Sequence, residues 1–472
     1  MTRIRSILPR GHNWPVVVLL LTAVIVAIAL QAAGRMTCEE VFDTASYLGF
    51  PLLPLEAGLV SIRTYGYPLF LQTVLGLTGS KAAVPWAQYA MHLLCVLCWY
   101  WGARAWFPSA WLAASAAGSL LVTNTLLRNV FIISSDGLAS SFAIATIGAL
   151  MATVAQPRRL VGWLLLGPLI FATYQIRPAY LFLVGLCPLL GVGLLALRQW
   201  LCVDGDHAGQ ALGRWPTGGL LAGIALGPLL VFCLVRWALV GDFGLVSFSG
   251  YNFCGVVGQF LDRPTISCLP AEVQPVAAEA LRRRDALAKE KSNFSGEVVT
   301  NYMMIENRFN DSTWTVFYPA ADTIAGGDPV QTNRLLVRLA ASVIRCRPTL
   351  YMIWLAKAWA RGVYILASEL VIHPLALVLL PLLPVIHFVT ISRRRDAVGL
   401  CPRDMLLPLN ALLLIAVVFS FVNLAFIIVS SPPLSRFMDA AGVFWLPWFC
   451  LVFVSRWQLM RSARRSDAET GR

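Results

Sequence analysis

The stretch "WPVVVLLLTAVIVAIALQAAG" (residues 14–34) contains no charged residue. A helix of about 20 apolar residues spans the hydrocarbon core of a bilayer, because each residue advances the helix by about 1.5 Å. Similar runs recur throughout the 472 residues, of which 58% are apolar and 13% charged. A soluble domain carries about 25% charged residues. The sequence therefore predicts an all-α, polytopic transmembrane helical bundle, since spans in lipid must satisfy their own backbone hydrogen bonds.

The apolar runs predict about ten membrane spans. The first run follows the basic start "MTRIR" and precedes many others, so we interpret it as a retained anchor rather than a signal peptide. The expected spans are 14–34, 84–104, 109–127, 137–155, 160–175, 178–197, 217–240, 370–391, 405–429 and 440–457.

The net charge of +13 comes mainly from basic segments between the spans and from the basic tail. Segments such as "AQPRRL" and "ISRRRDAVGLCPRD" belong on the cytoplasmic side by the positive-inside rule, together with both termini. Because the basic residues follow this rule, we do not expect nucleic acid as a partner. The expected organisation is an N-terminal transmembrane module (1–240) with an outer loop (35–83), an extracytoplasmic segment (241–369), and C-terminal spans with a cytoplasmic tail (370–472).

The extracytoplasmic segment contains two recognisable helical patterns. "AEVQPVAAEALRRRDALAKEKSNF" predicts a polar helix. "CRPTLYMIWLAKAWARGVYILASEL" predicts an amphipathic helix at the outer interface, with Lys357 and Arg361 on its polar side. Four cysteines are expected on this side and permit up to two disulfides in an oxidising compartment, with Cys254–Cys268 favoured by proximity in sequence. The four are Cys38, Cys254, Cys268 and Cys346.

An acidic patch, "CEEVFDTASY" (38–47), follows the first span. If it is helical, Glu39, Asp43 and Tyr47 share one face. A carboxylate exposed to water is ionised at neutral pH and can accept a proton from a hydroxyl group, so Asp43 is a candidate general base. The alternative interpretation is a solvated acidic start to a loop.

Four outer turns each place one arginine near the membrane boundary. Arg63 and Tyr67 lie in "SIRTYGYPLF", and Arg128 and Asp136 lie in "RNVFIISSDGLASS". The other two turns contain Arg177 and Arg436. Charged residues at this depth are costly unless they pair or bind a ligand, and the planar guanidinium group suits phosphate. Any single arginine can instead extend to a lipid headgroup. A phosphate site requires the acid and the arginines to converge on one pocket at the outer rim.

These elements together resemble the GT-C class of polytopic glycosyltransferases, which includes protein mannosyltransferase and aminoarabinose transferase relatives. The elements are D-x-x-x-Y at Asp43 and Tyr47, R-x-x-G-Y-P-L-F-L from Arg63, S-D-G-L at 135–138, and R-P at Arg177. "RPTLYMIWLAKAWARGVY" is similar to the interfacial helix of that class, whereas 241–345 has no counterpart in it.

The resemblance implies an inverting transfer of a sugar from a polyprenyl-phosphate donor to a glycan, lipid or protein acceptor on the extracytoplasmic side. Asp43 would be the base, and arginines such as Arg63, Arg177 and Arg436 would stabilise the departing phosphate. Donor, acceptor and membrane lipids are the expected partners. The candidate binding residues are Glu39, Glu40, Tyr47, Arg63, Tyr67, Arg128, Asp136, Arg177, Lys357, Arg361, His373 and Arg436.

No cofactor is expected, and the sequence lacks a loop with metal-ligand spacing. Glu39, Glu40, Asp43 and Asp136 offer oxygen atoms that a hard divalent ion accepts, so this alternative is open. The composition favours a bacterial inner membrane protein with its site facing outward. Two further functions remain: a transporter, which would place polar residues or broken helices at mid-bilayer, and a membrane protein that handles lipid headgroups without catalysis.

Overall fold

The computed structural model describes residues 13–201, 213–291, 302–393 and 403–470. Within these ranges the chain is helical and contains no strand, apart from one isolated bridge between Glu39 and Ile132. This confirms the all-α prediction. The loops expected on the cytoplasmic side after Arg198 and around "SRRRDAVGLCP" lie largely outside the described residues.

Six of the described helices, counting continuous pairs as one, are long and apolar enough to cross a membrane. They are α1 (Trp14–Ala32), α6 with α7 (Ala110–Leu120, Asn124–Asn129), α8 (Ser135–Ala155), η1 with α10 (Pro178–Phe182, Leu183–Leu201), α11 (Arg214–Val240) and α20 (Arg403–Ile428). Two bent pairs raise the number to eight: α18 (Pro348–Val371) with α19 (Pro374–Arg393), and α21 (Ser435–Ala441) with α22 (Trp445–Thr470).

The chain is therefore a multi-pass integral membrane protein. The two remaining expected spans coincide with α5 (Ala83–Ala103), which is outside this set, and α9 (Leu160–Ile176), which is shorter than the others. The count of ten stays a prediction.

Helix α8 lies at the centre of the bundle, because 94% of the residues in its most apolar 18-residue stretch are buried inside the protein. Its sequence is rich in alanine, serine and glycine, which lets neighbouring helices approach closely. At the crossing with α5, a Cβ atom added to Gly102 would lie 1.9 Å from the carbonyl oxygen of Gly148. A Cβ atom added to Gly148 would lie 2.3 Å from the Cα atom of Trp99. Only glycine fits at both positions.

We expect Gly148→Ala to lower the free energy of unfolding by roughly 1–3 kcal/mol, because the added methyl group forces two backbones apart. Gly118→Ala in α6 is the matched control, since nothing lies within 4 Å of a Cβ atom there. Thermal unfolding of the purified protein in detergent measures both. Equal midpoints for the two variants would contradict the close crossing of α5 and α8.

The first loop contains three short helices, α2 (Thr44–Leu48), α3 (Leu55–Val60) and α4 (Gly66–Thr78). The acidic patch is helical only from Thr44, with Asp43 as the N-cap residue, whereas Glu39 is in extended backbone paired with Ile132. The expectation that Glu39 shares a helical face with Asp43 was therefore wrong. Backbone hydrogen bonds to Phe131 and Ile133 hold Glu39 in its extended form.

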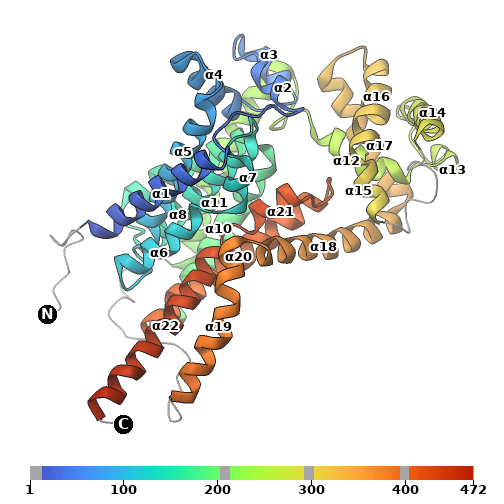
Figure 1. Ribbon diagram of the computed structural model, residues 1–472. Coiled ribbons are helices and arrows are strands. Elements are labelled where there is room, and N and C mark those ends of the chain that lie inside the picture. Colours follow the sequence, from blue (N-terminus) through green and yellow to red (C-terminus); the bar gives the residue numbers. More distant parts are fainter. Residues whose placement is uncertain (1–12, 202–212, 292–301, 394–402, 471–472) are drawn as a thin grey trace.

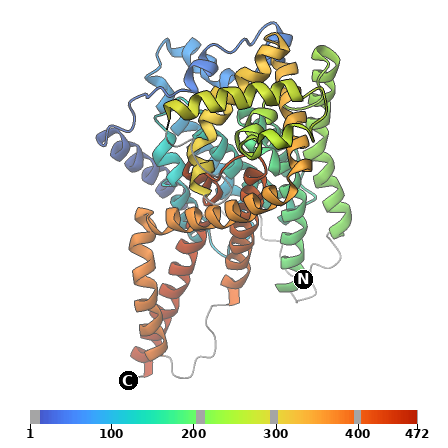
Figure 2. The ribbon, with the colours of Figure 1, turned by 90° about the vertical axis from the view of Figure 1, so that its right-hand side faces the viewer.

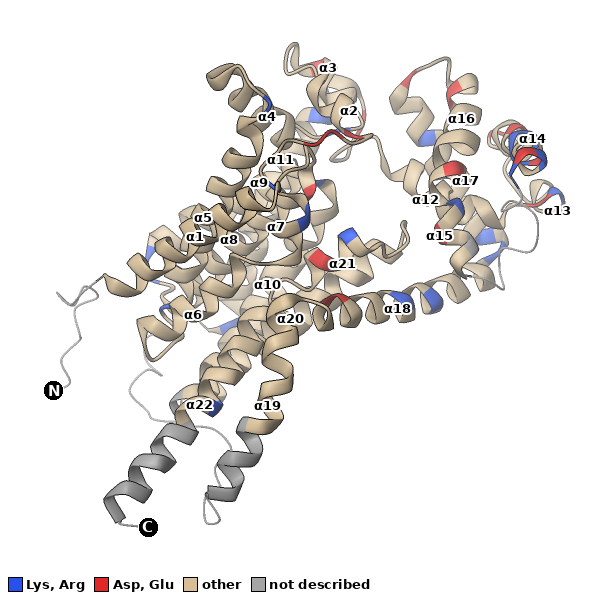
Figure 3. Cartoon of the chain, in the orientation of Figure 1, with Lys and Arg blue, Asp and Glu red and all other residues tan. Residues whose placement is uncertain are grey.

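Helices α12–α17 form what we call the helical subdomain (249–346), which packs beside the bundle (Figure 1). Its elements are α12 (Ser249–Val257), η2 (Gly258–Phe260), α13 (Arg263–Ile266), α14 (Gln274–Glu290), α15 (Tyr302–Asp311), the π-helical η4 (Ser312–Phe317), α16 (Tyr318–Ala325) and α17 (Pro329–Cys346). The expected polar helix is present as α14. Charged residues concentrate in this subdomain, whereas most bundle helices carry few (Figure 3).

Helix α18 leads from the subdomain to the C-terminal spans and meets α19 at an angle of 81°. Two views show α18 running across the direction of α19 and α22 (Figures 1 and 2). The buried core of the subdomain continues into α18, α20 and α21, so the subdomain is packed onto the C-terminal helices. The expected helix over residues 346–370 is therefore present as α18, and its position at the membrane interface stays a prediction.

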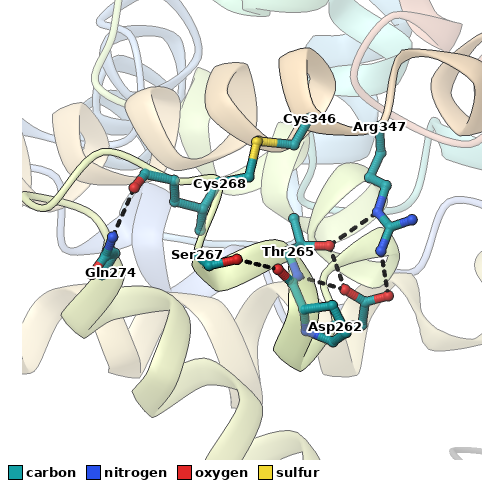
Figure 4. The surroundings of a disulfide bond; sticks show 9 residues. Asp262, Thr265, Ser267, Cys268, Gln274, Cys346 and Arg347 are labelled. Atoms are coloured by element: carbon teal, nitrogen blue, oxygen red, sulfur yellow. Dashed lines mark hydrogen bonds and ion pairs between the residues drawn. A yellow bond between two sulfur atoms is a disulfide. The ribbon is translucent and has the colours of Figure 1, made fainter.

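The subdomain contains a disulfide between Cys268 and Cys346, with the two Cα atoms 6.2 Å apart (Figure 4). The sequence expectation of Cys254–Cys268 was wrong. Cys254 is buried in α12, where its thiol donates to the carbonyl oxygen of Leu336. Cys268 follows α13 and reaches the end of α17 instead. Beside the disulfide, Asp262 accepts hydrogen bonds from Thr265 and from Arg347, which fixes the α13 turn against α17.

Candidate functional site

A cavity of about 1220 Å³ lies between the bundle and the helical subdomain. Its walls come from the first loop, the α7–α8 and α9–η1 turns, the subdomain, and the α20–α21 turn. The candidate residues that line it are Asp43, Tyr47, Arg63, Arg128, Asp136, Arg177 and Arg436. Segments separated by up to about 390 residues in sequence thus meet at one cavity, as the phosphate-site hypothesis requires.

Asp43 forms an ion pair with Arg63, with 2.6 Å between Oδ1 and Nη2. The Asp43 side chain is 28% exposed, and its Oδ2 atom makes no hydrogen bond to any other described residue. Arg63 is held in turn by Ser46, whose Oγ accepts from Nε at 2.9 Å, and by the ring of Tyr47, 4.7 Å from the guanidinium carbon. The ion pair at Oδ1 therefore fixes the orientation of the carboxylate, while Oδ2 is available to a ligand in the cavity.

A chain of polar contacts continues from Arg63 to a second ion pair. Arg63 donates to the Tyr47 hydroxyl, which lies 3.0 Å from the hydroxyl of Ser135. Ser135 also accepts from Arg177, and Arg177 pairs with Asp136 at 2.7 Å. Both members of this second pair are largely buried.

Burial by itself would lower the pKa of the Arg177 guanidinium, but the adjacent Asp136 carboxylate and other nearby acidic groups outweigh burial and raise that pKa. Arg177 therefore stays charged and neutralises Asp136. Removing either member would leave a buried charge without its partner, which is strongly unfavourable.

Arg128 makes two ion pairs that the sequence analysis did not anticipate. Its guanidinium lies 2.8 Å from Glu369 of α18 and 2.9 Å from Asp439 of α21. Both carboxylates are buried. Each is an isolated acid in an apolar stretch, and such residues are rarely tolerated in a membrane helix without a partner. That signal was available in the sequence, but it does not indicate which cation lies nearby.

Arg436 differs from the other cavity arginines. It is exposed, its guanidinium lies 4.9 Å from the ring of Phe437, and no carboxylate of the described chain pairs with it. The other five are paired: Arg63, Arg128, Arg177, Arg334 and Arg338. Arg177 also lies against Phe437, at 5.3 Å from the ring centre. Arg436 is thus the one arginine of the described cavity lining whose charge is not matched by a carboxylate, so its N–H groups are available to a ligand.

Three candidates from the first loop do not line the cavity. Glu39 pairs through its backbone with Ile132, and Glu40 forms an exposed ion pair with Lys81 at 2.5 Å. Tyr67 is fully buried, and its ring packs edge-on against Tyr47. Burial raises the pKa of Tyr67 well above its ordinary value, so the phenol stays neutral. Tyr67 supports Tyr47 from behind rather than reaching the cavity.

Three candidates near the C-terminal helices also lie outside the cavity lining: Lys357, Arg361 and His373. Arg361 is 3.5 Å from Glu306 of the subdomain. His373 is buried, and both ring nitrogens are used: Nδ1 accepts from the backbone of Leu375, and Nε2 donates to the carbonyl oxygen of Val122. His373 therefore has a structural position: it precedes the first residue of α19 and joins that helix to the turn between α6 and α7.

The described residues contain no group of three or more His, Cys, Asp and Glu side chains placed to hold a metal ion. Of the four acids considered as ligands, only Asp43 and Asp136 reach the cavity, and each binds an arginine through one oxygen.

The subdomain contributes cavity residues that the sequence analysis missed. They include Asn252, Asn310, Trp314 and Asn333. The segment 241–345 offered no motif, and the only local signal is an unusual concentration of aromatic residues around Trp314. Comparison of the chain with protein-family models, with curated proteins and with solved structures found no match.

We expect Arg177→Ala to lower the free energy of unfolding by about 3–5 kcal/mol, because Asp136 is then buried without a cation. Arg436→Ala is the matched control and should leave stability unchanged within about 0.5 kcal/mol, since it breaks no ion pair. Thermal unfolding in detergent reports both effects. A stable Arg177→Ala protein would show that the Arg177–Asp136 pair does not hold the α8 and α9 ends together.

Proposed function

We propose that this chain is a membrane glycosyltransferase that moves a sugar from a polyprenyl-phosphate donor to an acceptor hydroxyl with inversion. The observation that carries the proposal is one cavity that contains a carboxylate with a free oxygen, Asp43, together with an unpaired guanidinium, Arg436. A base for the acceptor and a cation for the leaving phosphate are the two groups that this reaction requires.

In the proposed reaction, Asp43 Oδ2 accepts the proton of the acceptor hydroxyl as its oxygen attacks the anomeric carbon of the sugar. The new bond forms on the face opposite the phosphate, which inverts the configuration. The bond between the anomeric carbon and the phosphate oxygen breaks, and its electron pair leaves with the polyprenyl phosphate. Arg436 donates hydrogen bonds to the phosphate, whose negative charge increases as the bond breaks. Arg177 lies close to Arg436, because both guanidinium groups contact the ring of Phe437.

The apolar part of the cavity wall supports a lipid-linked donor. Leu181, Phe426 and Ile427 line the cavity beside the arginines, and they lie at the ends of η1 and α20. A prenyl chain lying against these side chains would leave its phosphate at the α20–α21 turn, where Arg436 is found. The ion pair with Arg63 holds the base in place without using the oxygen that receives the proton.

The proposed setting is a bacterial inner membrane with the cavity on the extracytoplasmic side. Two features support this side. The short basic segments follow the other ends of the spans in the sequence, and the positive-inside rule puts such segments in the cytoplasm. The subdomain also contains a disulfide, and disulfides persist in oxidising compartments.

We expect Asp43→Asn to reduce transfer roughly 10²–10⁴-fold, because the amide keeps the shape and the Oδ1 acceptor but cannot take a proton. Glu40→Gln removes a neighbouring charge outside the cavity and is the matched control. A deletion strain is complemented with each variant, and lipid-linked sugars and envelope glycans are analysed by mass spectrometry. Donor should accumulate with Asp43→Asn alone; full complementation by that variant would refute Asp43 as the base.

We expect Arg436→Ala to weaken binding of undecaprenyl phosphate roughly 10- to 100-fold, which corresponds to the loss of a charge-assisted hydrogen bond. Titration of the purified protein in nanodiscs, followed by native mass spectrometry, measures the dissociation constant. The control is Arg263→Ala, a highly exposed arginine outside the cavity. Equal affinities for wild type and Arg436→Ala would place the phosphate elsewhere and remove the main support for a lipid-phosphate donor.

A further inference from the structure

One wall of the cavity is aromatic and rich in amides. Phe42, directly before the candidate base, is 86% exposed although its ring lies only 6.4 Å from that of Trp314. Both side chains line the cavity, as does Phe248, whose ring is 6.0 Å from Trp314. An exposed phenylalanine ring is hydrated, and a ligand that covers it with an apolar face would be stabilised by the burial of that surface.

Trp314 lies in η4, a π-helical segment between α15 and α16. π-Helical turns are rare, and they occur frequently at functional sites. The chain around this turn faces the cavity with five residues: Phe309, Asn310, Asp311, Trp314 and Thr315. The irregular turn therefore presents an aromatic ring and several polar groups to the same space.

Two amide side chains in this wall have hydrogen-bonding capacity to spare. Asn252 and Asn310 line the cavity, and their side chains make no hydrogen bond to another residue within the described ranges. Each amide offers two donor hydrogens and an acceptor oxygen, a set that matches a pair of neighbouring hydroxyl groups. Asn333 lies nearby and is held by the backbone of Gly250.

We propose that Phe42, Trp314, Asn252 and Asn310 form the acceptor subsite of the cavity, and that the acceptor is a carbohydrate chain. Sugar rings present apolar C–H faces to aromatic rings and hydroxyl groups to amides, so they use both features of this wall. A ligand stacked on Phe42 lies beside Asp43, where its hydroxyl meets the base. The inference rests on the proposed transfer reaction, which left glycan, lipid and protein acceptors open.

The two other acceptor classes fit this wall less well. A lipid acceptor would cover Asn252 and Asn310 with apolar surface and leave their amides without hydrogen bonds, which is unfavourable. A polypeptide bound by strand addition needs an exposed sheet edge, and the described residues contain no strand. The two arginines of this wall are also already in ion pairs, Arg334 with Asp242 and Arg338 with Glu272, so neither is an unmatched cation for an acidic peptide.

The test uses the purified full chain in lipid nanodiscs on an array of immobilised oligosaccharides built from hexopyranoses and pentofuranoses. We expect wild type to bind a subset of these glycans, and Phe42→Ala and Asn310→Ala each to reduce the affinity about tenfold, equivalent to one stacking or hydrogen-bonding contact. Both side chains are exposed, so these variants should fold normally. Trp314→Phe should retain partial binding, because an aromatic face remains.

Trp111→Ala, an exposed tryptophan of α6 outside the cavity, is the matched control and should bind like wild type. All variants should keep the wild-type affinity for undecaprenyl phosphate, which separates this inference from the donor site. Absence of glycan binding by wild type, or glycan binding that Phe42→Ala and Asn310→Ala leave unchanged, would overturn the inference. Binding to a parallel peptide array that is lost in the same variants would overturn it as well, in favour of a polypeptide acceptor.

Discussion

The architecture depends on the need to keep guanidinium and carboxylate groups charged at the edge of a lipid bilayer. Each buried group loses hydration there, and an opposite charge at hydrogen-bonding distance offsets the loss. Arg63 with Asp43, Arg177 with Asp136, and Arg128 with Glu369 and Asp439 meet this condition. Since the partners come from different loops and helices, satisfying the charges also draws those segments together around one cavity.

The same condition gives the cavity its chemical asymmetry. The ion pairs fix the positions of most charged groups, while one carboxylate oxygen of Asp43 and the guanidinium of Arg436 stay available. A fixed, partly satisfied set of charges is what an active site needs, because donors and acceptors that are already oriented do not have to reorganise during a reaction. The tight glycine crossing of α5 and α8 fixes the position of α8, whose first turn places Ser135 and Asp136 in the cavity lining.

Some of the errors made from sequence have a common cause. Glu39 was expected to share a face with Asp43 because four residues separate them, but a backbone pairing with Ile132, far along the chain, holds it extended. Cys254 was expected to pair with Cys268 because they are close in sequence, but α12 directs Cys254 into the core, and Cys268 meets Cys346 instead. In each case a contact between distant segments overrode a rule based on local spacing.

The sequence by itself determined the helical membrane class, the approximate positions of the long apolar helices, the polar helix α14 and the identity of the charged residues near the span ends. These features follow from composition and from periodicity over one or two turns, which are local properties of the chain. Only the tertiary structure decided which arginine is paired, which is free, and that Trp314 lies against Phe42. Such facts depend on contacts between segments that lie from 20 residues (Arg63 and Asp43) to 311 residues (Arg128 and Asp439) apart in the sequence, and no local pattern encodes them.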